Sequence, residues 1–519
     1  MEATERLEQN STPSLTRLIE RFGGHLVGRA DSVSIGDVRL DSRAVQGGDL
    51  FAALPGAVVD GVRFAPDAAD RGAAALLTPS GRGLRAAYLT RGRLPVWEHD
   101  EPRRVAGLVA GDLLGNPTQH LRVCGITGTN GKTTTAHLCG QLLENASLEP
   151  AIFGTAGHRL AGGERLDASH TTPGAPTLQR LCARHLARGG RSVVMEVSSH
   201  GLMQERTAGV DFDVAVFTNL TREHLDYHGD MQAYGSAKAR LFAELQAGRT
   251  AVLNRDDPFW LELARVCDQA GARVVTYSVT DTTRSQGELV ASRLRIDPEG
   301  SRFVLNGMGI EPTEIRLPLL GRYNVENALA ATAAALLLGA SPAHALSGLA
   351  TISPAPGRLE PIDVGGRGFQ LYIDYAHSPD ALDRVMRALR ANLESQPGNA
   401  AHARRLIVVY GCGGDRDVGK RPAMGRVVAG LADIAILTTD NPRSEDPSMI
   451  ASEVIEGLGK TDTRPELVLD RRAAIARAVE VARDGDIILV AGKGHECVQV
   501  VGDDVRSFDD RAVAMEVLS

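Results

Sequence analysis

A glycine-rich segment with a lysine and several threonines is the strongest chemical signal in this sequence. Thr127-Gly-Thr-Asn-Gly-Lys-Thr-Thr134 follows an apolar stretch that ends at Ile126 and precedes a helical pattern over residues 135–143. Backbone N–H groups of such a loop and the N-terminus of the following helix offer hydrogen-bond donors and positive potential to phosphate oxygens. Lys132 can reach the β- and γ-phosphates, and the Thr133 hydroxyl can bind Mg²⁺. The segment predicts a phosphate-binding loop.

The loop differs from the common phosphate-loop pattern at one position. That pattern has a glycine six residues before the lysine, where this chain has Ile126, and Gly128 follows two residues later. The pattern Asn-Lys-x-Asp, by which switch GTPases read guanine, does not occur in the sequence. We therefore predict a variant phosphate loop that binds ATP.

Three apolar stretches in the last third of the chain each run directly into a glycine-rich or charged loop. The loops are residues 411–416, 438–443 and 491–496. In an open parallel sheet such loops gather at the carboxyl edge of the strands, where ligands bind. The alternative is that they are solvated turns, but the repeated design favours one shared binding site.

The elements that must position these loops follow from the alternation of apolar and helical patterns. Apolar runs at residues 121–127, 192–197 and 213–218 alternate with helical patterns, which predicts βαβ units and a parallel sheet. The first hundred residues hold shorter apolar segments and predict a small mixed α/β domain, and a Pro/Gly cluster at residues 353–357 marks a second boundary. We expect an α/β fold with three domains, at residues 1–108, 109–353 and 354–519.

Composition restricts the remaining possibilities. The chain has 519 residues, 43% hydrophobic and 23% charged, which is typical of a globular protein. Its net charge of −7 and its 4% aromatic content argue against nucleic-acid binding. Six widely spaced cysteines suit a reducing cytosol, and the charged N-terminus predicts no signal peptide. The longest apolar run, residues 328–340, is too short for a bilayer span, so we expect a soluble cytoplasmic protein.

The phosphate loop resembles that of the Mur ligase family, whose members join an amino acid to a carboxylate at the expense of ATP. The likeness recurs in order along nearly the whole chain and is greatest to the members that add diaminopimelate. The matching segments are 41–43, 48–51, 127–134, 170–173, 196–202, 219–229, Lys238, 321–327, 357–360, 374–379 and 440–443.

The resemblance implies a fold and a reaction. The three domains would be a UDP-binding N-terminal domain, a central P-loop ATPase-type domain and a C-terminal Rossmann-like domain for the amino acid. The D-Glu carboxylate of UDP-N-acetylmuramoyl-L-Ala-D-Glu would attack the γ-phosphoryl group of ATP, and an amine of meso-diaminopimelate would then displace phosphate from the acyl phosphate. This ADP-forming step belongs to peptidoglycan precursor synthesis, hence to cell wall biogenesis, cell shape and cell division. We expect a monomer that does not associate with a membrane.

The resemblance also implies two Mg²⁺ ions. Thr133 and Glu196 would hold one, and His224 the second. Glu196 ends an apolar strand, where a carboxylate is costly to bury unless it meets a metal or hydrogen bonds. Lys238 lies in an amphipathic helical pattern, residues 234–242, where a solvated lysine is the ordinary interpretation. In the family the matching lysine adds CO₂ to become a carbamate, an anion that suits a hard cation. Lys132, Glu196, His224 and Lys238 are thus the predicted catalytic residues.

Further site residues carry over from the motifs by position. The predicted ATP contacts are Gly128, Thr129, Asn130, Gly131, Lys132, Thr133, Thr134, Asn324, Arg358, Asp374 and His377. The predicted contacts to the UDP-muramoyl dipeptide are Leu40, Ser42, Thr171, Thr172, Ser198, Gln204 and Arg206. The predicted diaminopimelate contacts are Arg416, Asp440, Asn441, Pro442, Arg443, Gly492 and Glu496. His170 stands where many relatives have Asn, and the loop 57–59 varies in the family, so neither is assigned a contact.

Arg443 is the residue expected to select the amino acid. Diaminopimelate carries an extra carboxylate at the end where lysine has only an ammonium group. A guanidinium can form a bidentate pair with that carboxylate, and it repels the ammonium group of lysine. Glu496 would take the distal ammonium group. The structural alternative is that Arg443 forms a surface ion pair with Glu445 or Asp446.

Other functions remain open at this stage. A nucleotide-driven switch or motor needs a phosphate loop, but it does not need three ligand-binding loops on a separate sheet. Within the ligase class, the alternatives are a folylpolyglutamate synthetase, a lysine-adding enzyme or another muramyl ligase; Asp41-Ser-Arg43 disfavours the folate enzyme. A binding-only relative is disfavoured by the presence of Lys132, Glu196, His224 and Lys238.

Overall fold

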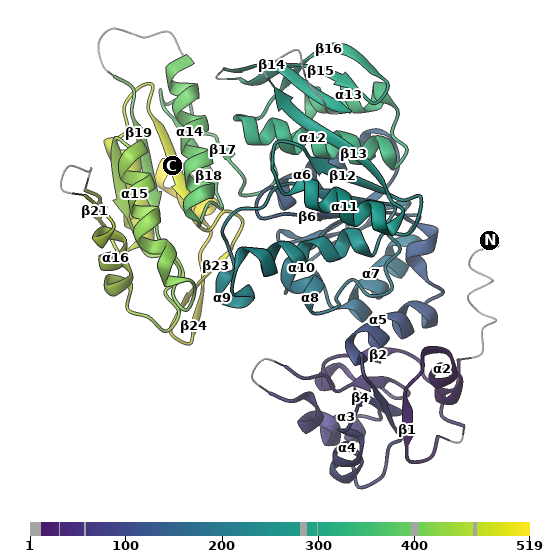
Figure 1. Cartoon of the computed structure of the whole chain (residues 1–519). Helices are drawn as coiled ribbons and strands as arrows, with labels where there is room; N and C mark the ends of the chain where they lie inside the picture. Colours follow the sequence, from purple (N-terminus) through teal and green to yellow (C-terminus); the bar gives the residue numbers. More distant parts are fainter. Residues whose placement is uncertain are drawn as a thin grey trace. The chain divides into compact units, whose positions relative to one another are not determined.

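The computed structural model describes residues 12–30, 32–56, 59–280, 288–297, 299–395, 403–459 and 464–519 (Figure 1). Ala57 and Val58, in the loop expected to vary, lie outside these ranges. The chain forms two compact units: unit 1 comprises residues 1–125, 148–214 and 244–249, and unit 2 comprises residues 126–147, 215–243 and 250–519. Within the described ranges, no helix is long and apolar enough to cross a membrane.

The N-terminal part of unit 1 is a five-stranded sheet between two layers of helices. Leu50 and Ala52 contribute to the core on one face and Phe51 to the core on the other, as the two-residue period of a strand requires. The strand order is β1 (His25–Val27), β5 (Val96–His99), β4 (Ala75–Pro79), β3 (Leu50–Ala52) and β2 (Val38–Arg39), with only β1 antiparallel. Helices α2 (Leu15–Phe22) and α5 (Pro102–Leu113) contribute to one core, and α3 (Ala65–Asp70) and α4 (Gly83–Leu89) to the other. Short 3₁₀ helices are η1 (Ser42–Ala44), η2 (Gly61–Phe64) and η3 (Pro117–His120).

The remainder of unit 1 carries a second group of strands. The predicted strand at 192–197 forms β10, and all five of its residues are buried, as expected for a parallel strand covered on both faces. It pairs in parallel with β7, and β8 and β9 continue the sheet antiparallel. The elements are β7 (Pro150–Gly154), β8 (Gly157–Arg159), η4 (Ala161–Gly163), β9 (Arg165–Leu166), α7 (Ala175–Ala187), β10 (Ser192–Glu196) and α8 (Ser199–Met203).

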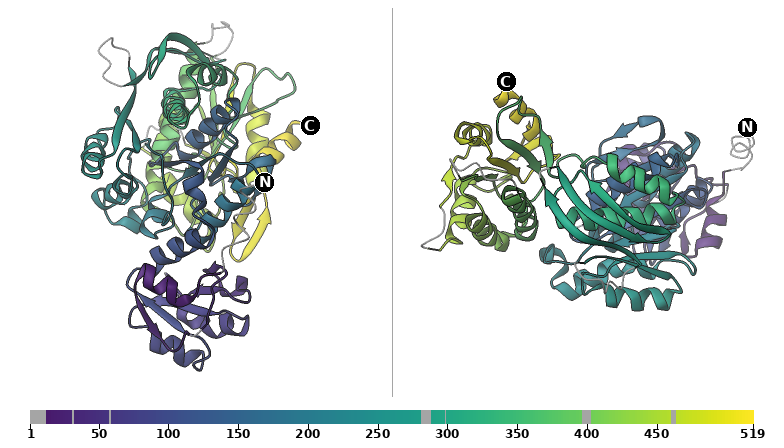
Figure 2. Two further views of the ribbon diagram at one scale, coloured as in Figure 1. Left: turned by 90° about the vertical axis from the view of Figure 1, so that its right-hand side faces the viewer. Right: turned by 90° about the horizontal axis from the view of Figure 1, so that it is seen from above.

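Unit 2 begins within the strand that precedes the phosphate loop. That strand, β6 (Arg122–Thr127), crosses the boundary after Gly125, and β11 (Val214–Phe217) crosses it after Val214. Three parallel strands, β12 (Thr250–Asn254), β13 (Arg273–Thr280) and β14 (Leu289–Asp297), continue into antiparallel β15 (Gly300–Gly307) and β16 (Ile310–Leu317), the long strands prominent in the right panel of Figure 2. The helices are α6 (Lys132–Asn145), α9 (Leu225–His228), α10 (Met231–Ala243), α11 (Trp260–Ala270), α12 (Arg322–Leu337) and α13 (Pro342–Thr351).

The C-terminal part of unit 2 is a doubly covered, mainly parallel sheet. Its strand order is β17 (Glu360–Ile362), β18 (Gln370–Asp374), β22 (Ile487–Ala491), β19 (Leu406–Tyr410), β20 (Ile434–Leu437) and β21 (Glu466–Leu467), with only β17 antiparallel. Helices α14 (Pro379–Ser395), α15 (Arg421–Leu431) and α16 (Pro447–Glu456) contribute to the core on one face, and α17 (Arg471–Val481) and α18 (Asp510–Leu518) to the core on the other. The remaining elements are η5 (Val418–Lys420) and the hairpin β23 (Val498–Val501) and β24 (Asp504–Ser507).

Several sequence-based expectations match the observed elements closely. The apolar stretches before the predicted loops at 411–416 and 438–443 form β19 and β20, which end at Tyr410 and Leu437, directly before those loops. The apolar run 328–340 lies largely in the buried helix α12. Trp97 opens a run of mainly charged residues, 97–101, and yet it is fully buried in β5. Because β18, β22, β19 and β20 are parallel, the loops that follow them leave the same edge of the sheet.

Candidate active site

The phosphate loop connects β6 to α6 and depends on two glycines. Gly128 has φ 151°, and a Cβ there would lie 1.9 Å from the Thr218 hydroxyl oxygen. Gly131 has φ 88°, and a Cβ would lie 2.3 Å from Asn327 Oδ1. Both positions therefore exclude a side chain. The helix starts at Lys132, three residues before the predicted helical pattern, so the first N–H groups of α6 belong to the loop itself.

Polar side chains from other segments of unit 2 hold the loop in place. Asn219 accepts hydrogen bonds from the Thr129 N–H through its carbonyl (2.8 Å) and from the Asn130 N–H through its side chain (2.9 Å). Asp380, in the first turn of α14, accepts a hydrogen bond of 2.8 Å from Asn130 Nδ2. Nothing in the sequence pattern singled out Asp380, and yet it links the phosphate loop to the C-terminal sheet domain. These contacts fix the position of the loop from two sides.

Lys132 and Lys238 converge on one carbonyl oxygen. Lys132 Nζ donates to Gly128 O at 2.9 Å, and Lys238 Nζ donates to the same oxygen at 2.7 Å. Lys238 is only 1% exposed, and its Nζ lies 4.2 Å from the centre of the Tyr234 ring. Burial and the charge of Lys132 hold the pKa of Lys238 well below its usual range, although Glu223 opposes the shift. The expected solvated lysine on α10 is therefore a buried amine beside the phosphate loop.

Glu223 lies between two histidines. Its Oε1 lies 3.5 Å from His377 Nε2, and its Oε2 lies 3.8 Å from His224 Nε2. Burial favours the neutral acid, but the hydrogen bond from His377 and the charges of His377, His224 and Lys132 outweigh it and lower the pKa of Glu223. His224 adopts φ 55°, a strained conformation for a histidine. No local pattern singles out Glu223, because only the fold brings it to His377.

A cavity in unit 2 adjoins the phosphate loop. Of the predicted nucleotide contacts, Asn130, Gly131, Thr134, Asn324, Arg358 and Asp374 line it. An adjoining cavity of about 560 Å³ shares Asn219, Tyr323, Glu326 and Arg384 with the first. Six residues predicted from scattered motifs thus line one cavity.

Arg358 and Asp374 form the wall of that cavity on the C-terminal side. Arg358 Nη2 donates to the Thr133 hydroxyl at 3.0 Å, and the guanidinium carbon lies 4.4 Å from the centre of the Tyr375 ring. Asp374 accepts hydrogen bonds from the N–H groups of Leu359 (2.6 Å) and Ala376 (2.7 Å). Burial raises the pKa of Asp374, against the opposing effect of Arg358 and of these hydrogen bonds. A cation and an acceptor therefore line the cavity near Thr133.

Glu196, in unit 1, is buried at the end of β10 and is hydrogen-bonded. Its Oε1 accepts from the Thr155 N–H at 2.8 Å and its Oε2 from the Thr155 hydroxyl at 3.3 Å. The Thr155 hydroxyl lies 3.0 Å from the Thr171 hydroxyl. A Cβ on Gly154 would lie 2.1 Å from Glu196 Oε1, so the carboxylate needs a glycine beside it. These contacts meet the requirement that a buried carboxylate has hydrogen-bond partners.

The predicted dipeptide contacts of unit 1 form one network. The Thr172 hydroxyl donates to Glu196 O at 3.0 Å and lies 3.2 Å from the Ser198 hydroxyl. Arg206 donates from Nη1 to Thr172 O at 2.9 Å and from Nη2 to Gln204 Oε1 at 2.8 Å. Thr171 joins this network by its contact with the Thr155 hydroxyl. Five of the predicted residues therefore lie around the end of β10.

Leu40 and Ser42 lie at the end of β2 in the same unit. Leu40 is 40% exposed, and its Cδ1 would lie 2.9 Å from a Cβ on Gly174, the residue that caps α7. Ser42 is buried at the start of η1. Leu40 thus lies next to the helix that follows Thr171 and Thr172.

The loops after β19 and β20 meet through Arg443. Arg443 Nη1 donates to Gly414 O at 2.6 Å and contacts Asn441 O at 3.5 Å. A Cβ on Gly414 would lie 1.9 Å from Pro442 O, which explains the glycine at the point where the loops touch. Glu445 pairs with Arg421 instead, and Asp446 caps α16. Arg443 therefore contacts loop carbonyls, whereas the two carboxylates of the structural alternative have other partners.

Asn441 joins the second loop to the third. Its Nδ2 donates to Glu496 Oε2 at 2.8 Å, and its Oδ1 accepts from the Val500 N–H at 3.0 Å. The fully buried Lys493 lies 3.4 Å from both Asn441 Oδ1 and Glu496 Oε2. Gly492, at φ 117°, leaves room for Asp440, whose Oδ2 would lie 2.5 Å from a Cβ there. The three loops thus contact one another, and Lys493, which was assigned no role, joins the second to the third.

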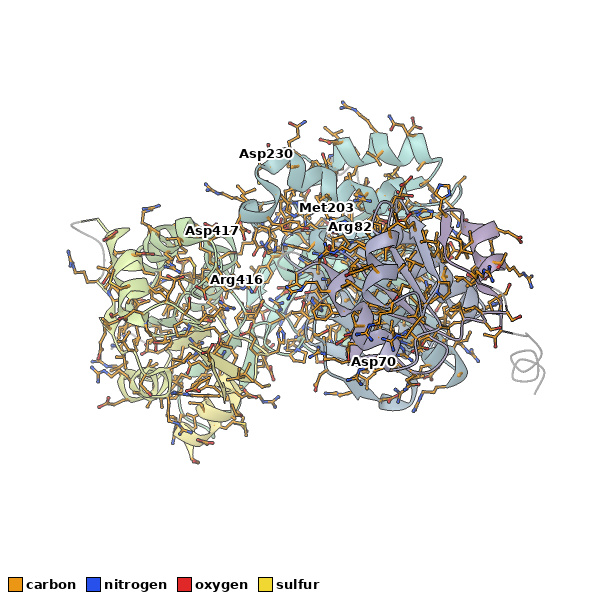
Figure 3. The ribbon with its side chains drawn as sticks, turned by 90° about the horizontal axis from the view of Figure 1, so that it is seen from below. Asp70, Arg82, Met203, Asp230, Arg416 and Asp417 are labelled. Atoms are coloured by element: carbon orange, nitrogen blue, oxygen red, sulfur yellow. The ribbon has the colours of Figure 1, made fainter. Side chains whose placement is uncertain are left out.

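Arg416 differs from the other predicted residues of this group. It is exposed on the loop after β19, beside Asp417 (Figure 3). A surface arginine at the edge of a binding site is available to a carboxylate ligand. Across the described ranges, no three His, Cys, Asp or Glu side chains gather as a group that could hold a metal ion.

Three family models match this chain in order. They are the Mur ligase family, catalytic domain (residues 34–95), the Mur ligase middle domain (126–335) and the Mur ligase, glutamate ligase domain (357–494). Together they account for most of the sequence and follow the three-domain α/β fold expected from it.

Full-length relatives and a solved structure agree with the models. The chain is 43% identical to a UDP-N-acetylmuramoyl-L-alanyl-D-glutamate–2,6-diaminopimelate ligase of Chromobacterium violaceum over 93% of this chain and 94% of the relative. It is 42% identical to the ligase of the same name from Streptomyces coelicolor, over 98% and 97% of the two chains. A solved structure of a ligase of that name superposes with a TM-score of 0.67 at 32% identity and covers 98% of this chain and 99% of the other.

Proposed function

The chain belongs to the Mur ligase family, and on that premise we propose that it adds meso-diaminopimelate to UDP-N-acetylmuramoyl-L-Ala-D-Glu. It is an ATP-dependent, ADP-forming amide ligase. The reaction transfers the γ-phosphoryl group of ATP to the D-Glu carboxylate, and the amine of the incoming amino acid then displaces phosphate. The product is a peptidoglycan precursor, which assigns the protein to the cytoplasmic stage of cell wall synthesis.

One observation carries the choice of amino acid. Arg443 and Glu496, of opposite charge, both contact Asn441, through its carbonyl and its side chain. The distal end of diaminopimelate carries a carboxylate and an ammonium group on one carbon. The Arg443 guanidinium can bind this carboxylate and the Glu496 carboxylate can bind this ammonium group. Lysine offers only the ammonium group. Arg416 would bind a substrate carboxylate from the exposed edge of the site.

The two other substrates bind to the groups already described. ATP would occupy the cavity beside the phosphate loop, with its phosphates at the loop N–H groups and Lys132. Arg358, Asp374 and His377 would contact the ribose and phosphates, and Asn324 the nucleotide. The UDP-muramoyl dipeptide would bind Leu40 and Ser42 at one end and Thr171, Thr172, Ser198, Gln204 and Arg206 at the other. Arg206 supplies a guanidinium that suits the carboxylate of the dipeptide.

The residues present suit Mg²⁺ if Lys238 is carbamylated. The amine of Lys238 is buried, and its lowered pKa favours the neutral form, which is the form that adds CO₂. The resulting carbamate, with Glu196, Thr133 and His224, would supply oxygen and nitrogen ligands for the two ions. Mg²⁺, when bound, neutralises phosphate charge. Lys132 neutralises further charge so that the carboxylate can approach the γ-phosphate.

The test compares amino acids on the unmodified enzyme. With UDP-N-acetylmuramoyl-L-Ala-D-Glu and ATP supplied, we expect kcat/KM for meso-diaminopimelate to exceed that for L-lysine by about 10²-fold or more, since one buried charge contact has that effect. Arg443→Ala should lose most of this preference through KM, and Arg426→Ala, an exposed arginine of α15, should keep it. Equal values, or a preference for lysine, would overturn the assignment.

A further inference from the structure

Arg421, the first residue of α15, is a fully buried arginine with an unusual set of partners. Its exposed fraction is 0%, and it donates to Glu445 from Nη1 and Nη2, both at 2.8 Å. Nη1 also donates to Glu453 at 2.7 Å, and Nη2 donates to Gly413 O at 3.2 Å. The guanidinium therefore touches the loop after β19 through Gly413 and the loop after β20 through Glu445.

Glu445 and Ser444 connect the same two loops a second time. Glu445 Oε1 accepts from the Asp415 N–H at 2.5 Å, and the Ser444 hydroxyl donates to Asp415 Oδ1 at 2.7 Å. The Ser444 N–H donates to Asp415 Oδ2 at 3.1 Å. We call Asp415, Arg421, Ser444 and Glu445 the loop clamp.

Two residues of the clamped loops adopt left-handed backbone conformations. Asp415 has φ 52° and Arg443 has φ 51°, left-handed values that are uncommon for residues other than glycine and less expected for Arg443 than for Asp415. Asp415 directly precedes Arg416, and Arg443 directly precedes Ser444. Each predicted carboxylate-binding arginine is thus a left-handed residue or the neighbour of one. The clamp bonds Asp415 directly and reaches Arg443 through the adjacent Ser444, while the Arg443 N–H donates to Val500 O at 3.1 Å and its carbonyl accepts from the Gly502 N–H at 2.6 Å.

The two carboxylates that pair with Arg421 differ in their other contacts. Substituting each in turn therefore separates an effect on the position of the loops from an effect on the stability of the protein. Glu445 and Glu453 bond the same Nη1 at similar distances, and both are partly exposed. Glu445 also accepts a hydrogen bond from the backbone of the neighbouring loop, whereas Glu453, on α16, pairs with Arg421. Loss of either weakens the ion pair, but loss of Glu445 also releases Asp415.

We propose that Arg421 and Glu445 are positioning residues for amino-acid selection: they hold the loop of Arg416 against the loop of Arg443, so that both guanidinium groups face one substrate. This inference rests on the proposed function, because it deepens the role of the same two loops. Neither residue touches the substrate. Their effect is to fix the direction of the arginines that do.

The experiment compares Glu445→Gln with Glu453→Gln. We expect Glu445→Gln to raise KM for meso-diaminopimelate by about tenfold, the effect of one charged hydrogen bond, and to lower the preference over lysine. KM for ATP and for the UDP substrate should stay within twofold of wild type, a range that ordinary surface substitutions give. Glu453→Gln should leave all three KM values and the preference near wild type. Equal changes in the two variants, or an increase in KM for ATP as large as that for the amino acid, would overturn the proposal.

Two further variants keep the result decisive. If Glu445→Gln does not fold, Ser444→Ala, which removes only the hydroxyl bond to Asp415, should still raise KM for the amino acid, and no change would contradict the clamp. Arg421→Lys should retain more of the selectivity than Arg421→Gln, because it keeps a cation beside Glu445.

Failure of the proposed function would appear separately, as wild-type enzyme that does not use diaminopimelate. In that case the same comparison with the amino acid that wild type prefers tests the clamp.

Discussion

At the scale of single residues, the most consequential contact is the one carbonyl that serves two lysines. Gly128 O accepts from Lys132 and from Lys238, and the second amine is buried. Two ammonium groups at one acceptor repel each other, and the less exposed one releases its proton more readily. Lys238 is therefore suited to react as an amine, whereas Lys132, at the start of α6, is placed to meet the phosphates.

This contrast predicts different behaviour of two alanine variants. Lys132→Ala should lower kcat by about 10²-fold or more, because a preorganised charge is lost, and added carboxylates should not help. Lys238→Ala should be nearly inactive but partly restored by short-chain carboxylates, which replace the anionic head of the carbamate. Steady-state assays with and without acetate or propionate measure this. Normal activity of Lys238→Ala would refute the metal-positioning role.

At the scale of elements, the phosphate loop depends on how closely α6 and α12 approach. Gly131, which precedes α6, faces Asn327 of α12, and the Thr135 hydroxyl donates to Asn327 Oδ1 at 3.3 Å. The helices pack against each other along their buried faces. A side chain at residue 131 would have to push α12 away or rotate the start of α6.

We therefore predict that Gly131→Ala raises KM for ATP and lowers stability by about 1–2 kcal/mol, the cost of a left-handed alanine, with further loss from the clash. Gly430→Ala is the control, since Gly430 lies in α15 with no neighbouring atom within 4 Å of an added Cβ. It should stabilise by about 0.5–1 kcal/mol, as expected for Gly→Ala within a helix. Denaturant unfolding and ATP titration measure both. Unchanged ATP kinetics in Gly131→Ala would contradict the steric argument.

At the scale of the whole molecule, the chain has several separate cores. The cores beside the N-terminal sheet and those beside the C-terminal sheet share no residue. The C-terminal core also contains an ion pair with both side chains 0% exposed, in which Arg471 of α17 bonds Asp510 of α18 at 2.7 Å. Arg471 also donates to Ala491 O, next to Gly492. Unfolding of such a molecule is not expected to be two-state.

We predict that Asp510→Ala lowers the stability of the C-terminal domain by about 3–5 kcal/mol, because it leaves a buried guanidinium unpaired. Differential scanning calorimetry should show one transition moving to lower temperature while the transition of the N-terminal sheet stays in place. Glu516→Gln is the matched control: Glu516 pairs with Arg472 between the same two helices, but both side chains are exposed. Its effect should be below about 1 kcal/mol. A single transition that shifts as a whole would refute independent unfolding.

The sequence by itself determined the elements and the types of loops they carry. The strands that precede the loops at 411–416 and 438–443, and the glycines of the phosphate loop, follow from local patterns. Such patterns suffice because apolar periodicity, capping and positive φ act within a few residues. The parallel order of the strands then placed three polar loops at one edge, as expected.

Tertiary structure alone decided which side chains are buried and which partners they have. Lys238 has the helical pattern of a solvated residue, yet the packing of α10 buries it against the phosphate loop. Glu223 meets His377, and Asp380 meets Asn130, across long stretches of chain. Periodicity tells which face of an element is apolar, but it does not tell which distant segment covers that face. The charge state and the partner of a side chain depend on that segment, so only the folded chain could give them.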